Sequence, residues 1–271
     1  MATMKLAALL IVLLSIIPEA ISPVRAIDST ITVSAIVPGT TSNTGNLRMT
    51  GHGSPLALVT FLRNGVVGGT TTCDSTGLFD KTLTSLDPGA ATFSMYGTDS
   101  DGRSTLTLSF TTSIVANTTL TLSGFLLPPT IAIKNTTLKR PQTQSTNGSA
   151  RSNATVTAIF NSDTITKQVG SGTDGRWQAS VSETFHLGKH STYALVQDGD
   201  GSQSNTSQVL SFTVVLSADL NNDDHVNLTD FSILMFNYGR SDFPNKAADI
   251  NDEGKVDLVD FSVMMFYWTG G

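Results

Sequence analysis

Two twelve-residue stretches near the end of the chain decide its architecture: DLNNDDHVNLTD at 219–230 and DINDEGKVDLVD at 249–260. Both place oxygen-bearing side chains at positions 1, 3, 5, 9 and 12, and the second repeats the first thirty residues later. Ca²⁺ is a hard cation that takes about six to eight oxygen ligands, and alternate positions of a tight loop can converge on one ion. The two stretches therefore predict two calcium-binding loops.

The predicted ligands follow the same spacing in both loops. Position 7 contributes its backbone carbonyl, so its side chain is free to vary and the His225 ring is not expected to bind metal. The predicted ligands of the first loop are Asp219, Asn221, Asp223, His225 (backbone oxygen), Asn227 and Asp230. Those of the second loop are Asp249, Asn251, Glu253, Lys255 (backbone oxygen), Asp257 and Asp260. We expect two bound Ca²⁺ ions.

Each loop departs once from the usual pattern. Position 6, where Gly is preferred for a sharp turn, is Asp224 in the first loop. Asp tolerates the left-handed backbone region better than most residues. Position 5 of the second loop is Glu253, one methylene longer than Asp. Neither change removes a ligand oxygen, so we expect both loops to bind.

An apolar stripe with helical spacing follows each loop. The stripes are Leu228, Phe231, Leu234, Met235, Tyr238 and Leu258, Phe261, Met264, Met265, Trp268. We expect two short helices whose stripes pack on each other as the only hydrophobic core of the tail. Because the ligands repel one another without a cation, the tail is expected to fold only with its metal.

The tail, 217–271, resembles a type I dockerin. It has that family's order of loop and helix, a linker at Gly239–Ala248, then loop and helix again, without the entering helix of a full EF-hand. The resemblance implies a cohesin-type partner domain. It also implies partner contacts at loop positions 10 and 11, which are Leu228, Thr229, Leu258 and Val259 here. The near-twofold repeat would allow either helix to dock.

The segment 27–216 predicts β-structure, because short Thr-, Ser-, Val- and Leu-rich runs alternate with Gly, Asp and Asn turn signals. It also repeats internally: Ala57–Thr60 matches Ala154–Thr157, Gly77–Phe79 matches Gly175–Trp177, and Leu108–Phe110 matches Leu210–Phe212. A duplicated unit of about 100 residues with short strands is typical of β-sandwiches. The pattern resembles bacterial Ig-like domains.

The expected fold class is mainly β, with two tandem Ig-like β-sandwiches followed by a small all-α dockerin-like module with two calcium loops. We place the sandwiches at 27–126 and 130–216 and the module at 217–271. Leu127-Pro128-Pro129 is expected to be a stiff connector, since paired prolines favour extended backbone.

The N-terminus has the pattern of a secretion signal. Met1–Lys5 carries a positive charge, Leu6–Ile17 is a twelve-residue apolar run, and Val24-Arg25-Ala26 offers a small-residue cleavage site. The run is shorter than the roughly 20 residues of a membrane-spanning helix. We predict a signal peptide at 1–26, cleavage over retention as an anchor, and a secreted or cell-surface protein without a further transmembrane span.

Charge and cysteine content limit the kinds of partner and of cross-link that the chain can have. The segment 27–216 has 11 acidic and 11 basic residues, whereas the tail has 10 acidic and 3 basic residues. No basic patch is present to meet phosphates, which argues against nucleic acid. Cys73 is the only cysteine, so no intrachain disulfide can form. A bound metal is another way to stabilise a small exported domain.

Three classes of function remain open from the sequence. The favoured class is a non-catalytic exported protein whose Ig-like domains are a spacer or adhesion arm. The second is a carbohydrate-binding accessory protein of polysaccharide degradation with a polysaccharide or cell-surface ligand, and the third is an unrecognised hydrolase. No catalytic constellation stands out, because the acidic pairs at 99/101 and 198/200 lie in turn patterns. Trp177 could line a sugar site, but its alignment with Phe79 favours core packing. Without a cohesin, the tail would be a calcium-stabilised cap used within the chain.

Overall fold

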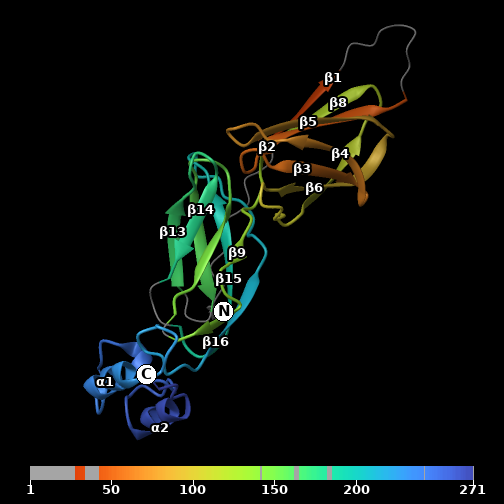
Figure 1. Ribbon diagram of the computed structural model, residues 1–271. Coiled ribbons are helices and arrows are strands. Elements are labelled where there is room, and N and C mark those ends of the chain that lie inside the picture. Colours follow the sequence, from red (N-terminus) through yellow and green to blue (C-terminus); the bar gives the residue numbers. More distant parts are fainter. Residues whose placement is uncertain are drawn as a thin grey trace, which may run out of the picture.

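The computed structural model describes residues 28–33, 43–140, 142–161, 165–181, 185–240 and 242–270. The predicted signal peptide, 1–26, lies outside these residues. The chain is mainly β, as predicted, with two short α-helices towards the C-terminus. Figure 1 shows two β-units in succession and the helices beyond the second unit. Within these described ranges, no helix is long and apolar enough to cross a membrane.

The first β-unit is a sandwich of two sheets around one core. One sheet has the order β1 (Asp28–Val33), β8 (Thr118–Leu126), β2 (Gly45–His52), β5 (Leu78–Leu86). The other has the order β4 (Val66–Thr72), β3 (Leu58–Arg63), β6 (Gly89–Thr98), β7 (Leu108–Ile114). Strand β8 pairs parallel with β2 and antiparallel with β1. Alternate residues of β2 and β6 are buried, as expected for strands with one face on a core.

The second β-unit is also a sandwich of two sheets around one core, with a different division of strands between the sheets. One sheet has the order β10 (Thr137–Lys139), β16 (Leu210–Val215), β15 (Gly188–Gln197), β12 (Thr155–Asn161), β13 (Ile165–Gly170). The other has the order β9 (Ala132–Ile133), β11 (Ser145–Ser149), β14 (Arg176–Ser180). Trp177 and Phe79 are 3% and 1% exposed in the cores of their units. The prediction that Trp177 packs in a core is therefore confirmed.

The connector between the β-units is packed rather than extended through solvent. Leu127, Pro128, Pro129 and Thr130 are all buried, and Leu127 belongs to the core of the first unit. Leu126 packs on the core of the second unit. The paired prolines therefore lie inside a junction that both units help to form.

Asp99 is the centre of a polar network at this junction. Its carboxylate accepts hydrogen bonds from Thr130 Oγ1 (2.6 Å) and Arg103 Nε (2.8 Å), and Arg103 also donates to Ser149 Oγ (3.2 Å). Burial opposes ionisation of Asp99, but these donors outweigh it and hold its pKa below the ordinary value. Beside it, Arg176 of the second unit pairs with Asp101 of the first (2.8 Å). The network joins the two units through the turn between β6 and β7.

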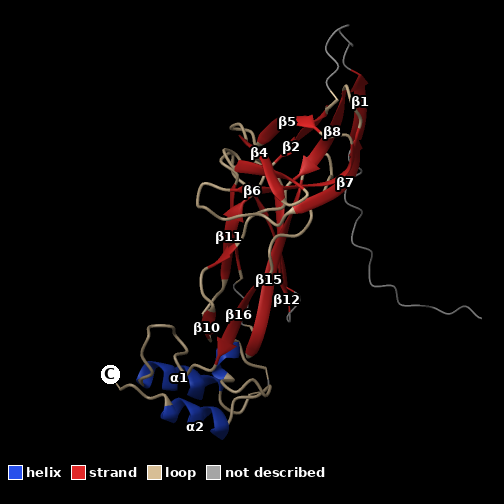
Figure 2. Ribbon diagram, turned by 90° about the vertical axis from the view of Figure 1, so that its right-hand side faces the viewer, coloured by secondary structure: helices blue, strands red, loops and turns tan. Residues whose placement is uncertain are grey.

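The C-terminal module, which we define as residues 217–270, contains α1 (Leu228–Asn237), the 3₁₀ turn η1 (Lys246–Ala248) and α2 (Leu258–Phe266). Figure 2 shows α1 and α2 side by side at the β10 and β16 end of the second β-unit. Its core is formed by Ala218, Leu220, Val226, Leu234, Phe243, Ala247, Ala248, Ile250, Val256 and Met264.

The prediction that the two apolar stripes form this core is wrong for half of their members. Five of the ten are exposed: Leu228, Met235, Tyr238, Leu258 and Met265. The stripe members Leu234 and Met264 are buried, and each shares its side of the helix with the buried carboxylate four residues earlier, Asp230 or Asp260. The loop carboxylate thus sets the rotation of each helix. The predicted linker also contributes Phe243, Ala247 and Ala248 to the core.

The junction network gives a stability prediction. Asp99→Ala leaves Arg103 and Thr130 without their shared acceptor, and we expect it to lower the free energy of unfolding by about 3 kcal/mol. Asp101→Ala, in the same turn but exposed, is the matched control and is expected to have a smaller effect. The measurement is urea denaturation followed by circular dichroism.

The same comparison has a pH dependence with a defined sign. Because the pKa of Asp99 is lowered in the folded protein, its contribution is present above its unfolded value of about 3.9 and lost as the pH falls through the folded value. The gap between the wild type and Asp99→Ala should therefore narrow in acid. A gap that is constant from pH 7 to pH 3 contradicts the role of the carboxylate charge.

Candidate metal centre

Both predicted calcium loops turn sharply at two left-handed positions. Position 4 has φ values of 63° at Asn222 and 65° at Asp252, and position 6 has 67° at Asp224 and 94° at Gly254. Asn, Asp and Gly are the residues that occupy this region at least cost. Asp224 therefore adopts the turn that the sequence required of it, and the first loop keeps the backbone course of the second.

The carboxylate at position 1 organises the turn of each loop. Asp219 Oδ1 and Oδ2 accept from the N–H groups of Asp223 (3.1 Å) and Asp224 (2.9 Å). Asp249 makes the same bonds to Glu253 (3.0 Å) and Gly254 (2.7 Å). These bonds curve the backbone of the loop around the position 1 carboxylate, so that side chains at alternate positions point towards one centre.

The carboxylate at position 12 is fully buried in both loops and ties the loop to its helix. Asp230 Oδ1 accepts from the N–H groups of Leu220 (2.7 Å) and Asn221 (3.2 Å), and its Oδ2 accepts from Asn227 N–H (3.0 Å). Asp260 makes the same three bonds at 2.7, 3.2 and 2.8 Å. A buried carboxylate needs such donors to offset the loss of hydration.

Positions 9 and 12 also form the capping box of the following helix. Asn227 and Asp257 are the N-caps of α1 and α2 and accept from the N–H groups of Thr229 (2.7 Å) and Val259 (2.8 Å). The carboxylate three residues later bonds back to the N-cap N–H, which satisfies two backbone donors at the helix start. The same side chains thus begin the helix and face the loop.

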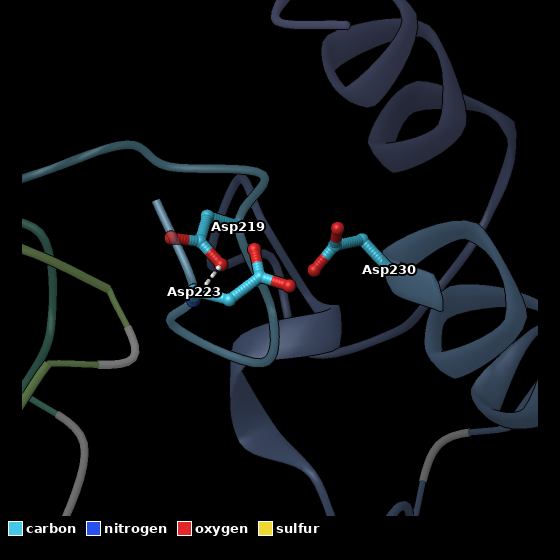
Figure 3. Close-up of side chains that lie close together, drawn as sticks. All are labelled: Asp219, Asp223 and Asp230. Atoms are coloured by element: carbon cyan, nitrogen blue, oxygen red, sulfur yellow. Dashed lines mark hydrogen bonds between the residues drawn. The ribbon is translucent and has the colours of Figure 1, made fainter. Parts of the chain in front are cut away.

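Acidic side chains meet in both loops at a spacing suited to Ca²⁺. Oxygens of Asp219, Asp223 and Asp230 lie within 4.8 Å of one another, as do those of Glu253, Asp257 and Asp260. Figure 3 shows the Asp230 carboxylate, from the start of α1, facing those of Asp219 and Asp223. Ligands about 2.3–2.6 Å from one ion are at most about 5 Å apart, so both groups fit a calcium ion.

The two loops differ in which predicted ligands gather. Position 9 is Asn227 in the first loop and Asp257 in the second, where it joins the acidic group while Asp249 stays outside it. The longer side chain of Glu253 reaches the group in spite of its extra methylene. The roles of the amides of Asn221, Asn227 and Asn251 and of the position 7 carbonyls stay predictions.

The side chains at position 7 contact other residues of their loops, which the sequence pattern did not predict. Lys255 Nζ lies 2.7 Å from Asp257 Oδ2 and 3.9 Å from Glu253 Oε1. A hydrogen bond from Lys255 lowers the pKa of Asp257, and the pKa of Lys255 is raised in return. In the first loop, the exposed His225 has its Nδ1 3.0 Å from Asp223 O. Lys255 therefore lies against carboxylate oxygens of two predicted calcium ligands of the second loop.

Arg140 and His186 belong to the surroundings of the second loop, and no sequence pattern pointed to either. Both lie in the second β-unit and contact Asp252 at position 4 of the loop. Their separations in sequence from Asp252 are too long for any local motif to reveal. The second loop is therefore held by the β-unit as well as by its own turn.

Apolar side chains lie exposed beside both loops. At positions 10 and 11, Leu228, Leu258 and Val259 are 71%, 63% and 49% exposed. Phe236 and Phe266, near the ends of α1 and α2, are 62% and 82% exposed. Beside α1 lies a groove of about 480 Å³, lined by Thr229, Ser232, Ile233, Phe236, Asn237, Pro244 and Asn245. Exposed apolar residues that form one contiguous patch are typical of interaction surfaces.

Cys73 is unsuited to nucleophilic chemistry. It is buried in the core of the first β-unit, and burial raises the pKa of its thiol to about 11. A reactive cysteine needs a lowered pKa and access to solvent. Cys73 is therefore a small residue of the core of the first β-unit.

No family model and no curated protein matches this sequence. Among solved structures, fibronectin(III)-like modules of Clostridium thermocellum CbhA match 68% of this chain and 94% of theirs, at 14% identity and a TM-score of 0.24. A Ca²⁺-stabilized adhesin of an ice-binding Antarctic bacterium matches 76% of this chain, which spans about half (55%) of its length, at 18% identity and 0.23. Murine CEACAM1b matches 60% of this chain and 87% of its own, at 12% identity and 0.24. Scores at this level support no statement about function.

The matched position 6 residues give a prediction about the loop backbone. Gly254→Ala places a side chain at a left-handed residue where no atom lies within 4 Å of the new Cβ, so only backbone strain acts. We expect a loss of about 1 kcal/mol in the stability of the module, and a gain of up to about 1 kcal/mol from Asp224→Gly. Thermal unfolding followed at 222 nm, at one fixed calcium concentration, measures both. Changes of the same sign in the two variants would contradict the strain argument.

Proposed function

We propose that this is an exported, non-catalytic protein whose C-terminal module binds two Ca²⁺ ions and docks as a type I dockerin to a cohesin-type domain, with two Ig-like β-sandwiches as a spacer or adhesion arm. The observation that carries the proposal is the pair of acidic groups, one per loop, beside exposed apolar residues at positions 10 and 11 of each loop.

Calcium is supported by the chemistry of the donors. Each group offers three carboxylate oxygens within 4.8 Å, and hard oxygen donors suit Ca²⁺ rather than softer metals. The residues that would hold the ions are those at positions 1, 3, 5, 7, 9 and 12 of each loop. Bound Ca²⁺ would offset the repulsion between carboxylates of a tail that carries 10 acidic residues and only 3 basic ones.

Docking is supported by the apolar residues that the module leaves exposed. Leu228 and Leu258 precede the buried carboxylates and point out of the core, as do Phe236 and Phe266 at the other ends of the helices. A partner domain that covers them would remove apolar surface from water, at about 25 cal/mol for each Å². The groove beside α1 offers one place for a partner side chain to enter.

The arm role is supported by the junction between the β-units. The connector is buried, and Asp99 and Arg103 link the first unit to Thr130 and Ser149 of the second. Separating the two units would break these hydrogen bonds and leave buried polar groups without partners, which is costly. Two sandwiches joined in this way would hold the C-terminal module at a fixed distance from the start of the arm.

The calcium proposal predicts two binding events. Titration of the full chain by calorimetry should show two Ca²⁺ ions per chain, and Asp219→Ala and Asp249→Ala should each remove one. Asp87→Ala, an exposed acidic residue of the first β-unit, is the control and should leave both events intact. A chain that binds no Ca²⁺ at millimolar concentration would end the proposal.

The docking proposal predicts that a charge on both exposed leucines blocks the partner. Against a panel of type I and type II cohesin domains with Ca²⁺ present, Leu228→Asp combined with Leu258→Asp should weaken binding by at least about tenfold, since each buried leucine contributes roughly 1.5–3 kcal/mol. The single variants report which helix docks. Val66→Asp, at a 71% exposed residue of β4, is the control. Binding that survives the double change would place the partner elsewhere.

A further inference from the structure

The second calcium loop contacts the second β-unit through Asp252. The carboxylate of Asp252 pairs with Arg140 Nη1 (3.2 Å) and His186 Nδ1 (2.8 Å), and it accepts a hydrogen bond from Leu187 N–H (3.3 Å). Asp252 is the left-handed residue at position 4, between the predicted ligands Asn251 and Glu253. Its side chain therefore points out of the loop while its backbone shapes the loop.

Arg140 is buried against the second loop rather than exposed to solvent. Only 5% of its surface is exposed, although arginine is among the residues least often buried. It follows β10, and its N–H donates to Val215 O (3.4 Å), at the end of the strand that leads into the module. Its guanidinium also donates to the carbonyl oxygens of Asp249 (3.3 Å) and Lys246 (3.2 Å). One side chain thus holds η1, the first residue of the loop and its left-handed turn.

The first loop provides an internal comparison, because its backbone follows the same course. Position 4 is Asn222 there, which is uncharged and exposed, whereas Asp252 is half-buried. Leu220, Val226 and the buried Asp230 of the first loop are matched by Ile250, Val256 and Asp260 of the second. The contact of position 4 with the β-unit thus distinguishes two loops that share one backbone course and matching core residues.

We propose that Arg140 is a positioning residue that couples calcium in the second loop, and not in the first, to the attachment of the C-terminal module on the second β-unit. Calcium would hold Asn251 and Glu253 in one geometry and so fix the turn that presents Asp252 to Arg140. Coupling is reciprocal, so the attachment must raise the calcium affinity of the second loop by the factor by which calcium strengthens the attachment. The inference rests on the proposed calcium binding.

The amide of Leu187 reports this attachment directly, because its N–H donates to Asp252. In the full chain, NMR hydrogen exchange at Leu187 should slow about tenfold on addition of Ca²⁺, a factor common for coupled sites. The slowing should persist in Asp219→Ala and vanish in Asp249→Ala, which keeps the backbone carbonyl that Arg140 contacts. The amide of Ser204, bonded to Val196 O elsewhere in the same β-unit, is the reference and should not respond.

Variants of Arg140 and Asp252 test the reciprocal effect, that of the attachment on the calcium affinity of the second loop. Arg140→Ala should abolish the calcium response of Leu187 and weaken the second calorimetric event by the same factor, while the first event is unchanged. Arg140→Lys keeps the charge without the fork of donors and should restore the response only in part. Asp252→Asn removes the carboxylate charge but tolerates the left-handed turn, so it tests the clamp if Arg140→Ala fails to fold. Asn222→Asp, at the same position of the first loop, should leave Leu187 unchanged.

The outcomes separate this inference from the proposed function. If no Ca²⁺ binds, both are overturned. If two ions bind but Leu187 responds equally in Asp219→Ala and Asp249→Ala, the calcium proposal stands and the coupling is overturned. Equal weakening of both calorimetric events in Arg140→Ala also overturns the coupling, because it would show a general loss of stability.

Discussion

The module depends on two buried carboxylates, Asp230 and Asp260. Each is fully buried, and an ionised carboxylate in that position is costly unless donors replace its hydration. Three backbone N–H groups do so, from the start of the loop and from the N-cap of the helix. This requirement fixes where each helix begins and which face turns inwards. The apolar residues pack around a position that the carboxylate has already set.

The loops were predictable because their chemistry is local. The ligand spacing and the left-handed position 6 are contained in twelve-residue patterns, and each helix begins at the end of its pattern. The capping boxes Asn227–Asp230 and Asp257–Asp260 are also visible in the sequence, where the same residues fit the metal pattern as well as a helix start. The apolar stripes misled for a physical reason: a spacing shows that residues share a face, not whether that face turns to the core or to solvent. A surface that docks a partner has the same periodicity as a core.

In the β-region, the internal repeat correctly indicated equivalent core positions, such as Phe79 and Trp177. The junctions were not predictable. Asp99 and Asp101 lie in an ordinary turn sequence, and only the fold brings Thr130 and Arg176 to them. Arg140 is more than a hundred residues from Asp249, and no periodicity links the two. Burial of a charged side chain is decided by tertiary partners, so a single sequence carries no local signal for it.

The junction between the β-units and the junction with the C-terminal module both pair an arginine with an aspartate, but they differ in what positions the aspartate. At the first, the Asp99 carboxylate is held by Arg103 and Thr130, and every partner is a protein group whose position depends on packing alone. At the second, Arg140 holds a carboxylate whose backbone lies between predicted calcium ligands, so the geometry of the acceptor depends on what fills the loop. The first junction therefore needs no metal, whereas under the proposed calcium binding the second would be conditional on it. An exported chain of this design would be a stiff arm with a calcium-dependent joint at the end that meets its partner.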